Sequence, residues 1–250
     1  MASEWPGVMP TISAMAIAQR KVALVTGAGV RVGLAIAQDL ARHGFLVAAH
    51  YHAHRPPGRM FALSADLSAP NGADELFRSF RARFRRLDLL VCSAARFEHA
   101  SLEGTDAGTF DAQMDLNARA PLLLARAFAA LLRRSKGSIV NIADIGGGLV
   151  PWSGYSAYAA SKAALVRLTE CLALELAPQV RVNAVAPGTV LWPSSCPAAM
   201  RRELVKRIPL RRTGTPADVA EAVRYLARAT FVTGTVLPVD GGRRLNGRTA

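Results

Sequence analysis

The sequence predicts an α/β fold of three layers, in which helices cover both faces of a doubly wound, mostly parallel seven-stranded sheet. Short runs of apolar and β-branched residues alternate with longer segments whose apolar residues recur at helical spacing. This alternation is typical of strands that are buried on both faces and joined by helices. The 250 residues, 51% of them hydrophobic, are enough for one large core, so a single domain is expected.

The expected elements follow from these runs. Strands are predicted at 21–26, 46–52, 60–64, 87–92, 138–142, 181–186 and 236–239. Helices are predicted at 32–43, 71–84, 109–132, 155–176, 198–206 and 216–229.

One connection is short for a parallel sheet. About seven residues, 53–59, join the second and third expected strands, and Pro56 and Pro57 lie among them. Parallel strands are usually joined by a crossover of a dozen or more residues. We therefore expect a bare loop here instead of a helix, with one face of this sheet edge thinly covered.

The basic composition raises the question of an anionic partner. A net charge of +13 is compatible with nucleic acid or an anionic membrane. The arginines, however, are spread over several expected helices without interleaved aromatic residues, as 78–86 and 201–207 illustrate. This pattern favours a solvated basic surface, so no nucleic-acid partner is predicted.

Cysteine usage and the length of apolar runs indicate the cellular compartment in which the protein is expected. Cys92, Cys171 and Cys196 are far apart and form no C-x-x-C pair, which argues against disulfides and against a zinc site. No run reaches the ~18 apolar residues needed to span a bilayer. Residues 1–19 lack the layout of a signal peptide and are interpreted as a flexible extension of a domain covering 20–250. A cytoplasmic protein without a membrane partner is expected.

A glycine-rich turn joins the first expected strand to the first helix. Residues 26–33 read T-G-A-G-V-R-V-G. Glycines in this position let the backbone approach a pyrophosphate, and the helix N-terminus attracts its charge. An ordinary strand-to-helix turn can have the same composition. In this setting the turn predicts a Rossmann-type nucleotide site with contacts from Gly27, Gly29, Arg31, Val32 and Gly33.

The end of the second expected strand bears on the choice of cofactor. Domains that bind NADH commonly place an acidic residue there to hold the ribose hydroxyls. Residues 50–55 read H-Y-H-A-H-R and contain no carboxylate. Arg31, His52 and Arg55 suit a 2′-phosphate instead, so NADPH is the predicted cofactor.

The three histidines of this segment admit a second interpretation. His50, His52 and His54 alternate along a strand, which places them on one face where they could ligate a metal. No fourth ligand lies at a recognisable spacing. A mixture of buried and solvated histidines is the simpler interpretation, and no metal is predicted.

Tyr158 and Lys162 form a candidate catalytic pair. Their spacing of four residues puts the phenol and the ammonium on one helix face, one turn apart. A neighbouring cation favours the phenolate and is expected to lower the tyrosine pKa from its usual ~10. Tyr158 would then act as an acid or base near neutrality. The pair follows Asp144 at the end of the fifth strand and is preceded by Asn117 in a helix.

With these residues in view, the chain resembles the short-chain dehydrogenase/reductases over 21–245. Asn117, Tyr158 and Lys162 match three members of that family's catalytic tetrad. The run R-V-N-A-V-A-P-G at 181–188 matches the segment that lines the nicotinamide, and V-D-G-G at 239–242 matches the C-terminal signature. The resemblance implies an oxidoreductase that forms a homotetramer through the helices near 109–132 and 155–176. The further expected cofactor contacts are Asp66, Leu67, Ser93, Ala94, Lys162, Pro187 and Gly188. Asp66 and Leu67 admit a second role as a cap of the following helix, beside accepting a hydrogen bond from the adenine amino group.

The departures from the family pattern are informative. Asp144 replaces the tetrad serine, Arg31 replaces the central glycine of the loop, and C-S-A-A at 92–95 replaces the usual N-N-A-G. In a ketone reductase the serine hydroxyl donates to the carbonyl oxygen. A carboxylate in its place repels the developing oxyanion unless it stays protonated, so Asp144 argues against routine ketone chemistry.

The same departures resemble the pteridine reductase branch, which includes dihydromonapterin and dihydrofolate reductases. That branch pairs an Asp with the catalytic Tyr, carries an Arg in the glycine-rich loop and has His-Tyr-His at the end of the second strand. Its pterin is sandwiched between the nicotinamide and a Phe after the fourth strand, where Phe97 stands. A core or surface phenylalanine is the other interpretation of Phe97.

The resemblance implies a reaction and its residues. NADPH delivers hydride to a pterin-type C=N bond while Tyr158, coupled to Asp144, donates a proton. Lys162 holds the nicotinamide ribose, and Asn117 supports a water that relays protons. The expected substrate contacts are Phe97, Asp144, Tyr158 and Trp192, the last on a lid over 189–210.

Two alternatives remain open. One is an NADPH-dependent carbonyl or 3-oxoacyl-thioester reductase of the same superfamily. The other is a non-catalytic NADPH-binding sensor, which the intact Asn117, Tyr158 and Lys162 disfavour.

Overall fold

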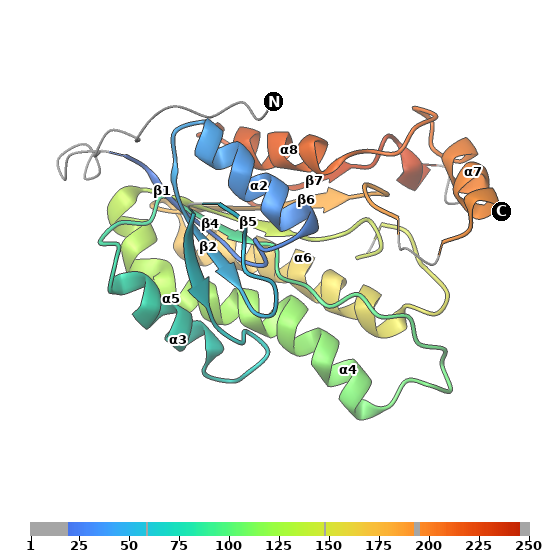
Figure 1. The fold of residues 1–250 in the computed structure, drawn as a ribbon, viewed down its shortest axis with the longest axis horizontal. Helices are drawn as coiled ribbons and strands as arrows, with labels where there is room; N and C mark the ends of the chain where they lie inside the picture. Colours follow the sequence, from blue (N-terminus) through green and yellow to red (C-terminus); the bar gives the residue numbers. More distant parts are fainter. Residues whose placement is uncertain (1–19, 59, 148, 193–195, 246–250) are drawn as a thin grey trace, which may run out of the picture.

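A parallel sheet forms the centre of the protein, shown by a computed structural model that describes residues 20–245 except 59, 148 and 193–195 (Figure 1). The expected extension 1–19 lies outside the described residues. The strands are β1 (Val22–Val25), β2 (Leu46–Tyr51), β3 (Phe61–Ser64), β4 (Leu89–Cys92), β5 (Ser138–Ile142), β6 (Arg181–Pro187) and β7 (Val236–Val239). Their order is β3-β2-β1-β4-β5-β6-β7. The predicted fold class is confirmed, and the sheet is parallel in every pairing instead of mostly parallel.

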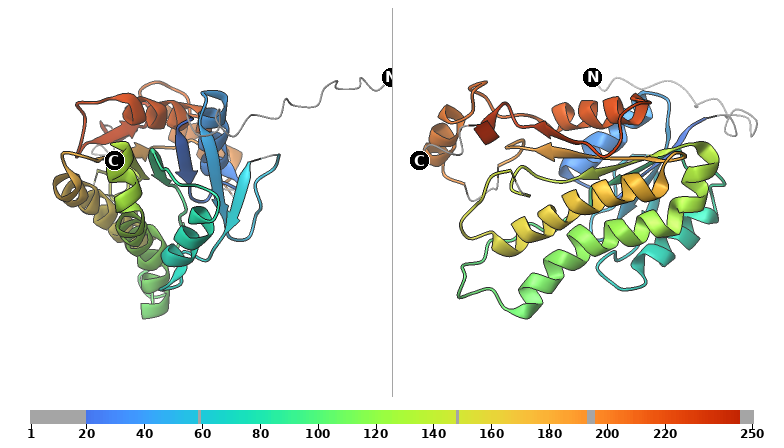
Figure 2. Two further views of the ribbon diagram at one scale, coloured as in Figure 1. Left: turned by 90° about the vertical axis from the view of Figure 1, so that its left-hand side faces the viewer. Right: turned by 180° about the vertical axis from the view of Figure 1, so that it is seen from behind.

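Helices cover both faces of the sheet (Figures 1 and 2). On one face lie α2 (Arg31–Arg42) and α8 (Pro216–Arg228), which bury Ile36 and Val223 against β1 and its neighbours. On the other lie α3 (Gly72–Arg81), α5 (Ala120–Ser135) and α6 (Ser156–Leu176), whose core includes Phe80 and Phe128. The shorter α7 (Ala198–Lys206) follows β6. None of the described helices is both long and apolar enough to cross a membrane.

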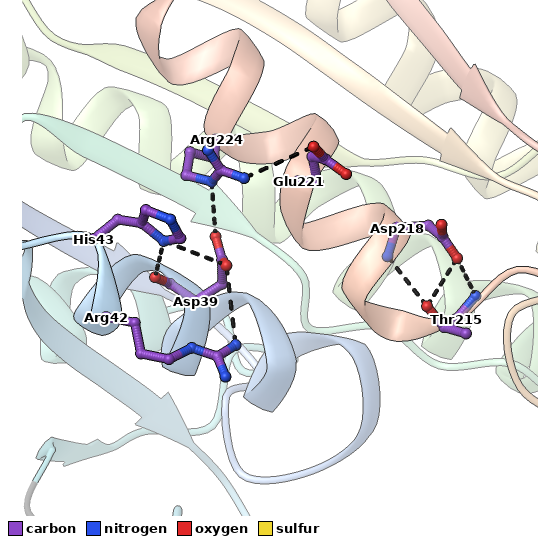
Figure 3. A network of polar contacts seen from close by, with 7 residues as sticks. All are labelled: Asp39, Arg42, His43, Thr215, Asp218, Glu221 and Arg224. Atoms are coloured by element: carbon purple, nitrogen blue, oxygen red, sulfur yellow. Dashed lines mark hydrogen bonds and ion pairs between the residues drawn. The ribbon is translucent and has the colours of Figure 1, made fainter.

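Polar contacts join α2 to α8 (Figure 3). Arg224 Nε donates to Asp39 Oδ2 at 3.2 Å, and His43 Nδ1 lies 3.4 Å from Asp39 Oδ1. A capping box formed by Thr215 and Asp218 begins α8. The Arg224–Asp39 contact therefore joins α8 to the C-terminal half of α2.

The connection between β2 and β3 is a bare loop, as its length predicts. The described residues of 52–60 contain no helix. Phe61 on β3 keeps 38% of its surface exposed and packs edge-on against Phe84, with ring centroids 5.2 Å apart. This edge of the sheet is therefore thinly covered.

The helix expected at 109–132 is interrupted. The structure has α4 (Ala107–Met114), a π-helical turn labelled η1 (Asp115–Arg119) and then α5. Ala120 N–H donates to the Asp115 carbonyl, five residues earlier. Pro121 has no N–H to donate to the Asn117 carbonyl four residues earlier, which explains why the α-helical pattern breaks here. The expectation of one regular helix was wrong because apolar spacing does not reveal a missing donor.

Candidate active site

The predicted site residues meet at the carboxyl ends of the strands. This is the edge where parallel sheets bind ligands, and β1 and β4 are neighbours at its centre although they are not consecutive in sequence. The loops after β1, β4, β5 and β6 all open onto this edge.

The glycine-rich turn after β1 is a close-packed cradle. A Cβ added to Gly29 would lie 1.7 Å from the His54 carbonyl oxygen, and one added to Gly33 would lie 2.2 Å from the Gly27 oxygen. Gly27 has a φ of +65°. α2 begins without a capping side chain and without an acidic residue in its first turn, so its free N–H groups suit an anion. The cradle fits a dinucleotide pyrophosphate.

Threonine links this turn to the segment after β4. Thr26 Oγ1 accepts hydrogen bonds from the backbone of Ser93 at 2.9 Å and of Ala94 at 3.1 Å. A Cβ on Gly27 would lie 2.8 Å from the Ala94 Cα. The expected cofactor contacts Ser93 and Ala94 are therefore beside the cradle. Thr26 belongs to the motif, but its bonding role was not predicted.

Asp66 and Leu67 follow β3 at the same edge. Asp66 is exposed and accepts from the Ser68 backbone at 2.9 Å and from the Ser68 hydroxyl at 2.6 Å. These bonds lower the pKa of Asp66. Leu67 is buried in the core. Asp66 thus stabilises its own turn and stays an ionised, exposed acceptor.

His50 has a structural role that sequence reasoning missed. Its Nδ1 accepts the Gly27 N–H at 3.2 Å, so Nε2 carries the proton and donates to the Ala65 carbonyl at 3.1 Å. Burial lowers the pKa of His50 from 6.5 to about 4. A neutral His50 therefore ties the cradle to the end of β3.

The other two histidines are exposed beyond the end of β2. The strand ends at Tyr51, one residue earlier than expected, and His52, His54 and Arg55 lie on the loop. The described residues contain no group of three ligands able to hold a metal. Arg31 begins α2 with a φ of +54° and is exposed.

Tyr158 and Asp144 are in direct contact. Tyr158 Oη donates to Asp144 Oδ2 at 3.1 Å, and the Gly146 N–H donates to Asp144 Oδ1 at 2.7 Å. Tyr158 is only 5% exposed. Lys162 is buried below the pair, donates from Nζ to the Ile142 carbonyl at 2.8 Å, and lies 5.9 Å from the centre of the Tyr158 ring.

The electrostatics of this group differ from the expectation. Burial, and then the neighbouring Asp144, hold the pKa of Tyr158 well above its usual value, so the predicted lowering is wrong. The reason is geometric, because Lys162 directs its ammonium to a carbonyl while Asp144 contacts the phenol. Burial also raises the pKa of Asp144 and lowers that of Lys162 to about 8. Tyr158 is therefore a neutral hydrogen-bond donor.

Asn117 braces the site through its side chain. Its Oδ1 accepts from the Arg96 backbone at 2.8 Å, and its Nδ2 donates to the Arg96 carbonyl and to Ser161 Oγ, both at 2.9 Å. Ser161 in turn donates to the Tyr158 carbonyl at 2.7 Å. Asn117 thus fixes both α6 and the segment after β4. The water relay expected for Asn117 stays a prediction.

Aromatic side chains line the mouth of the site. Phe97 stacks on Tyr155 with ring centroids 4.9 Å apart and meets Tyr158 edge-on at 4.7 Å. Phe97 keeps 47% of its surface exposed, so a large part of this residue is open to solvent. Trp152 approaches Tyr155 at 6.0 Å. Trp192 is half-buried after β6, and no ring contact of the described residues joins it to Phe97 or Tyr158.

Pro187 and Gly188 come from the end of β6, which extends one residue further than expected. Gly188 N–H donates to the Val239 carbonyl at 2.9 Å. A Cβ on Gly188 would lie 2.8 Å from the Asp240 Cα. The segment that was expected to line the nicotinamide is therefore held against the turn that follows β7.

A dinucleotide cradle beside a buried Tyr-Asp-Lys group defines an oxidoreductase that uses a nicotinamide cofactor. A family model described as enoyl-(acyl carrier protein) reductase matches residues 27–244. The chain belongs to the short-chain dehydrogenase/reductase superfamily.

Individual relatives agree with this assignment. The chain is 36% identical over 240 residues to a putative ketoacyl reductase 2 of the granaticin polyketide synthase from Streptomyces violaceoruber, covering 90% of this chain and 96% of the relative. It is 34% identical to a 3-oxoacyl-[acyl-carrier-protein] reductase from Bos taurus, covering 90% and 98%. Ligand-free aldohexose dehydrogenase from Thermoplasma acidophilum has a similar structure, with a TM-score of 0.84 and 30% identity over 90% of this chain and 94% of that one.

Proposed function

We propose that this protein is an NADPH-dependent reductase of a pterin-type C=N bond, with Tyr158 as the proton donor and Asp144 as its partner. The observation that carries the proposal is the 3.1 Å hydrogen bond between Tyr158 Oη and Asp144 Oδ2. Asp144 stands where the family's ketone reductases have a serine hydroxyl. A buried carboxyl group suits a substrate that presents N–H donors beside the bond to be reduced.

The proton chemistry follows from the raised pKa values. Tyr158 is neutral, so its hydroxyl is able to donate a proton to the ring nitrogen of a C=N bond. Asp144 accepts one hydrogen bond from Tyr158 and one from Gly146. Its two oxygens have further lone pairs that can accept from an amino-pyrimidine. Bound NADPH supplies the hydride. In this proposal the Lys162 ammonium, which donates to the Ile142 carbonyl, also holds the nicotinamide ribose and favours the developing phenolate.

The preference for NADPH rests on the loops after β1 and β2. Gly29 packs against the His54 carbonyl, which brings the loop that carries His52 and Arg55 next to Arg31. All three side chains are exposed, and no carboxylate occurs among residues 50–55. The 2′-phosphate of NADPH can accept charge-assisted hydrogen bonds from these side chains. The ribose hydroxyls of NADH have no carboxylate here to which they could donate.

Phe97 is the proposed stacking surface for a planar substrate. Tyr155 stacks on this ring at 4.9 Å, so the Phe97 ring is held in a defined orientation. Asn117 holds the backbone of Arg96, the residue before Phe97. A flat heterocycle on Phe97 would lie beside Tyr158, whose ring is 4.7 Å away.

Substrate competition tests this function. NADPH oxidation is followed with dihydromonapterin, dihydrobiopterin, dihydrofolate and acetoacetyl thioesters, with Tyr158→Phe as the blank. We expect turnover of the pterins and a large loss in Asp144→Ser, because a neutral hydroxyl has one acceptor oxygen where the carboxyl group has two and binds N–H donors more weakly than a carboxylate. Turnover of the thioester alone, retained or improved in Asp144→Ser, would contradict the proposal.

The second candidate is an NADPH-dependent reductase of a ketone or 3-oxoacyl thioester. The names of the two enzyme relatives favour it. The raised pKa of Asp144 makes it chemically reasonable, since a protonated carboxyl group donates to a carbonyl oxygen as serine does. It predicts ketone turnover that falls as the pH rises and Asp144 loses its proton.

The assembly we propose is a homotetramer formed through α4, α5 and α6. The family resemblance is the main ground, and Phe110 on α4 and Leu122 on α5 leave 41% and 38% of their surfaces exposed. Light scattering after size exclusion is expected to give four times the 26.6 kDa of one chain. A monomer mass at micromolar concentration would overturn this assembly.

A further inference from the structure

One cation beside the reacting group is not used by the mechanism above. Arg243 begins the short helix η2 (Arg243–Leu245) after β7. Its Nη1 donates to Thr189 Oγ1, and its guanidinium lies over the Trp152 ring, 5.4 Å from the ring centre. These two contacts join the C-terminal turn to the loops after β5 and β6.

Arg243 has no carboxylate within ion-pair distance among the described residues. The next residue, Arg244, differs in this respect, because it pairs with Asp240 at 3.1 Å. Arg243 is partly buried, and this burial lowers the pKa of its guanidinium. Asp144 and Asp240 act on this cation electrostatically without an ion-pair contact, so the guanidinium keeps N–H groups that an anionic ligand can pair with directly.

The position of Arg243 connects it to the candidate active site. A Cβ added to Gly146 would lie 3.2 Å both from Asp144 Oδ1 and from the Trp152 ring, so a single glycine separates the carboxyl group from the indole. Arg243 lies on this indole, and Asp144 acts on it electrostatically. Asp144 also contacts Tyr158, so Arg243 and Tyr158 lie on two sides of the same carboxyl group.

We propose that Arg243 recognises an anionic group of the substrate, a carboxylate or a phosphate, at the end remote from the bond that is reduced. This inference rests on the proposed function and names its substrate class. Trp152 provides an apolar surface for the linking portion, and Thr189 orients the guanidinium so that its other N–H groups face the ligand. For a pterin substrate the anion is a carboxylate on the tail, and for a thioester it is a phosphate of the carrier.

The test compares matched substrates that differ in this group. Dihydrofolate carries carboxylates, whereas dihydromonapterin has a neutral tail. Acetoacetyl-CoA carries phosphates, whereas the acetoacetyl N-acetylcysteamine thioester does not. The variants are Arg243→Gln and Arg243→Lys, with Arg244→Gln as the neighbouring control. We expect the ratio of kcat/KM for the anionic over the neutral partner to fall roughly 10- to 100-fold in Arg243→Gln, mainly through KM.

The control variants distinguish recognition of the anion by Arg243 from a general structural effect of the substitution. Arg243→Lys is expected to recover part of the ratio, and Arg244→Gln to keep it at the wild-type value. An equal loss for both partners in Arg243→Gln, or a matching loss in Arg244→Gln, would overturn the assignment. A shift of the pH profile with the neutral partner and an unchanged ratio would also overturn it, because Arg243 would then act through Asp144.

If the proposed pterin reduction is wrong, the kinetic results differ from those expected if only the role of Arg243 is wrong. If wild type turns over only the thioester pair, the pterin proposal fails, and the ratio for that pair still decides the role of Arg243. If neither pair is turned over, calorimetry with folic acid and with 6-hydroxymethylpterin replaces the kinetics. Arg243-dependent binding of folic acid alone supports the anion site, and equal binding of both, or of neither, overturns it.

Discussion

The cofactor side and the substrate side of this site are built by different means. On the cofactor side the parts are backbone segments in close contact, since Gly29 has no room for a Cβ beside His54 and His50 bonds directly to the Gly27 N–H. On the substrate side the parts are side chains, with Tyr158 on Asp144 and Phe97 on Tyr155. Substitutions on the first side are therefore expected to affect stability and binding together, whereas those on the second affect catalysis with little change in the fold.

The largest effect is expected for Tyr158→Phe. The variant loses only the hydroxyl that donates to Asp144, and kcat should fall roughly 10²- to 10⁴-fold while the NADPH dissociation constant changes little. Steady-state kinetics and NADPH fluorescence measure the two quantities. Tyr225→Phe, on the exposed face of α8, is the matched control. Full activity in Tyr158→Phe would show that the proton comes from another group.

The next effect concerns stability and pH. The folded state lowers the pKa of His50 from 6.5 to about 4, so it favours the neutral ring. This contribution is complete above pH 6.5 and is lost as the pH falls toward 4, by about 3 kcal/mol in total. Urea unfolding at several pH values measures it. His50→Gln should be less stable at pH 7.5 and less dependent on pH below 6.5, whereas His54→Gln keeps the wild-type slope.

Gly29→Ala should lower both stability and cofactor affinity. A methyl group 1.7 Å from the His54 carbonyl forces the two loops apart, which is expected to cost about 1–3 kcal/mol of unfolding free energy. Calorimetric NADPH binding should weaken in parallel. Gly108→Ala adds the same methyl group in the first turn of α4, where the nearest atom is 3.6 Å away, and should be neutral or stabilising. If Gly29→Ala binds NADPH as tightly as wild type, the close packing of Gly29 against His54 is not required for cofactor binding.

The smallest effect is expected for thiol modification. Burial raises the pKa of Cys92 to about 12, while Cys171 is exposed and Cys196 is partly exposed. Iodoacetamide at pH 8 should label Cys171 and Cys196 and leave both Cys92 and the activity unchanged, as peptide mass analysis can check. Rapid labelling of Cys92 in the folded protein would mean that the segment after β4 opens.

The sequence predicts the backbone framework better than the contacts within it. Apolar runs identified the seven strands, and the seven-residue link before β3 correctly predicted a bare loop. Spacing alone placed Tyr158 and Lys162 on one helix face, but it gave the wrong direction for the tyrosine pKa. The direction depends on the burial of Tyr158 and on its contact with Asp144, 14 residues away, neither of which helical spacing reveals.

Other parts of the site lay beyond pattern reasoning for similar reasons. The buried neutral state of His50 depends on Ala65 and Gly27, which come from different loops. Arg243 reaches the site because the turn after β7 contacts Thr189 and Trp152. The π-helical turn did have a signal, since Pro121 lies four residues after Asn117 and removes the N–H that an α-helix requires.

The π-helical turn adds one residue to the continuous helical segment formed by α4, η1 and α5. Each residue of an α-helix advances the chain by about 100° around the axis, so the extra residue sets the angular phase of α4 relative to α5. Deleting one residue from 115–119 would change this phase by about 100° and turn Asn117 away from Arg96 and Ser161. The two segments that Asn117 joins would then lose their common anchor.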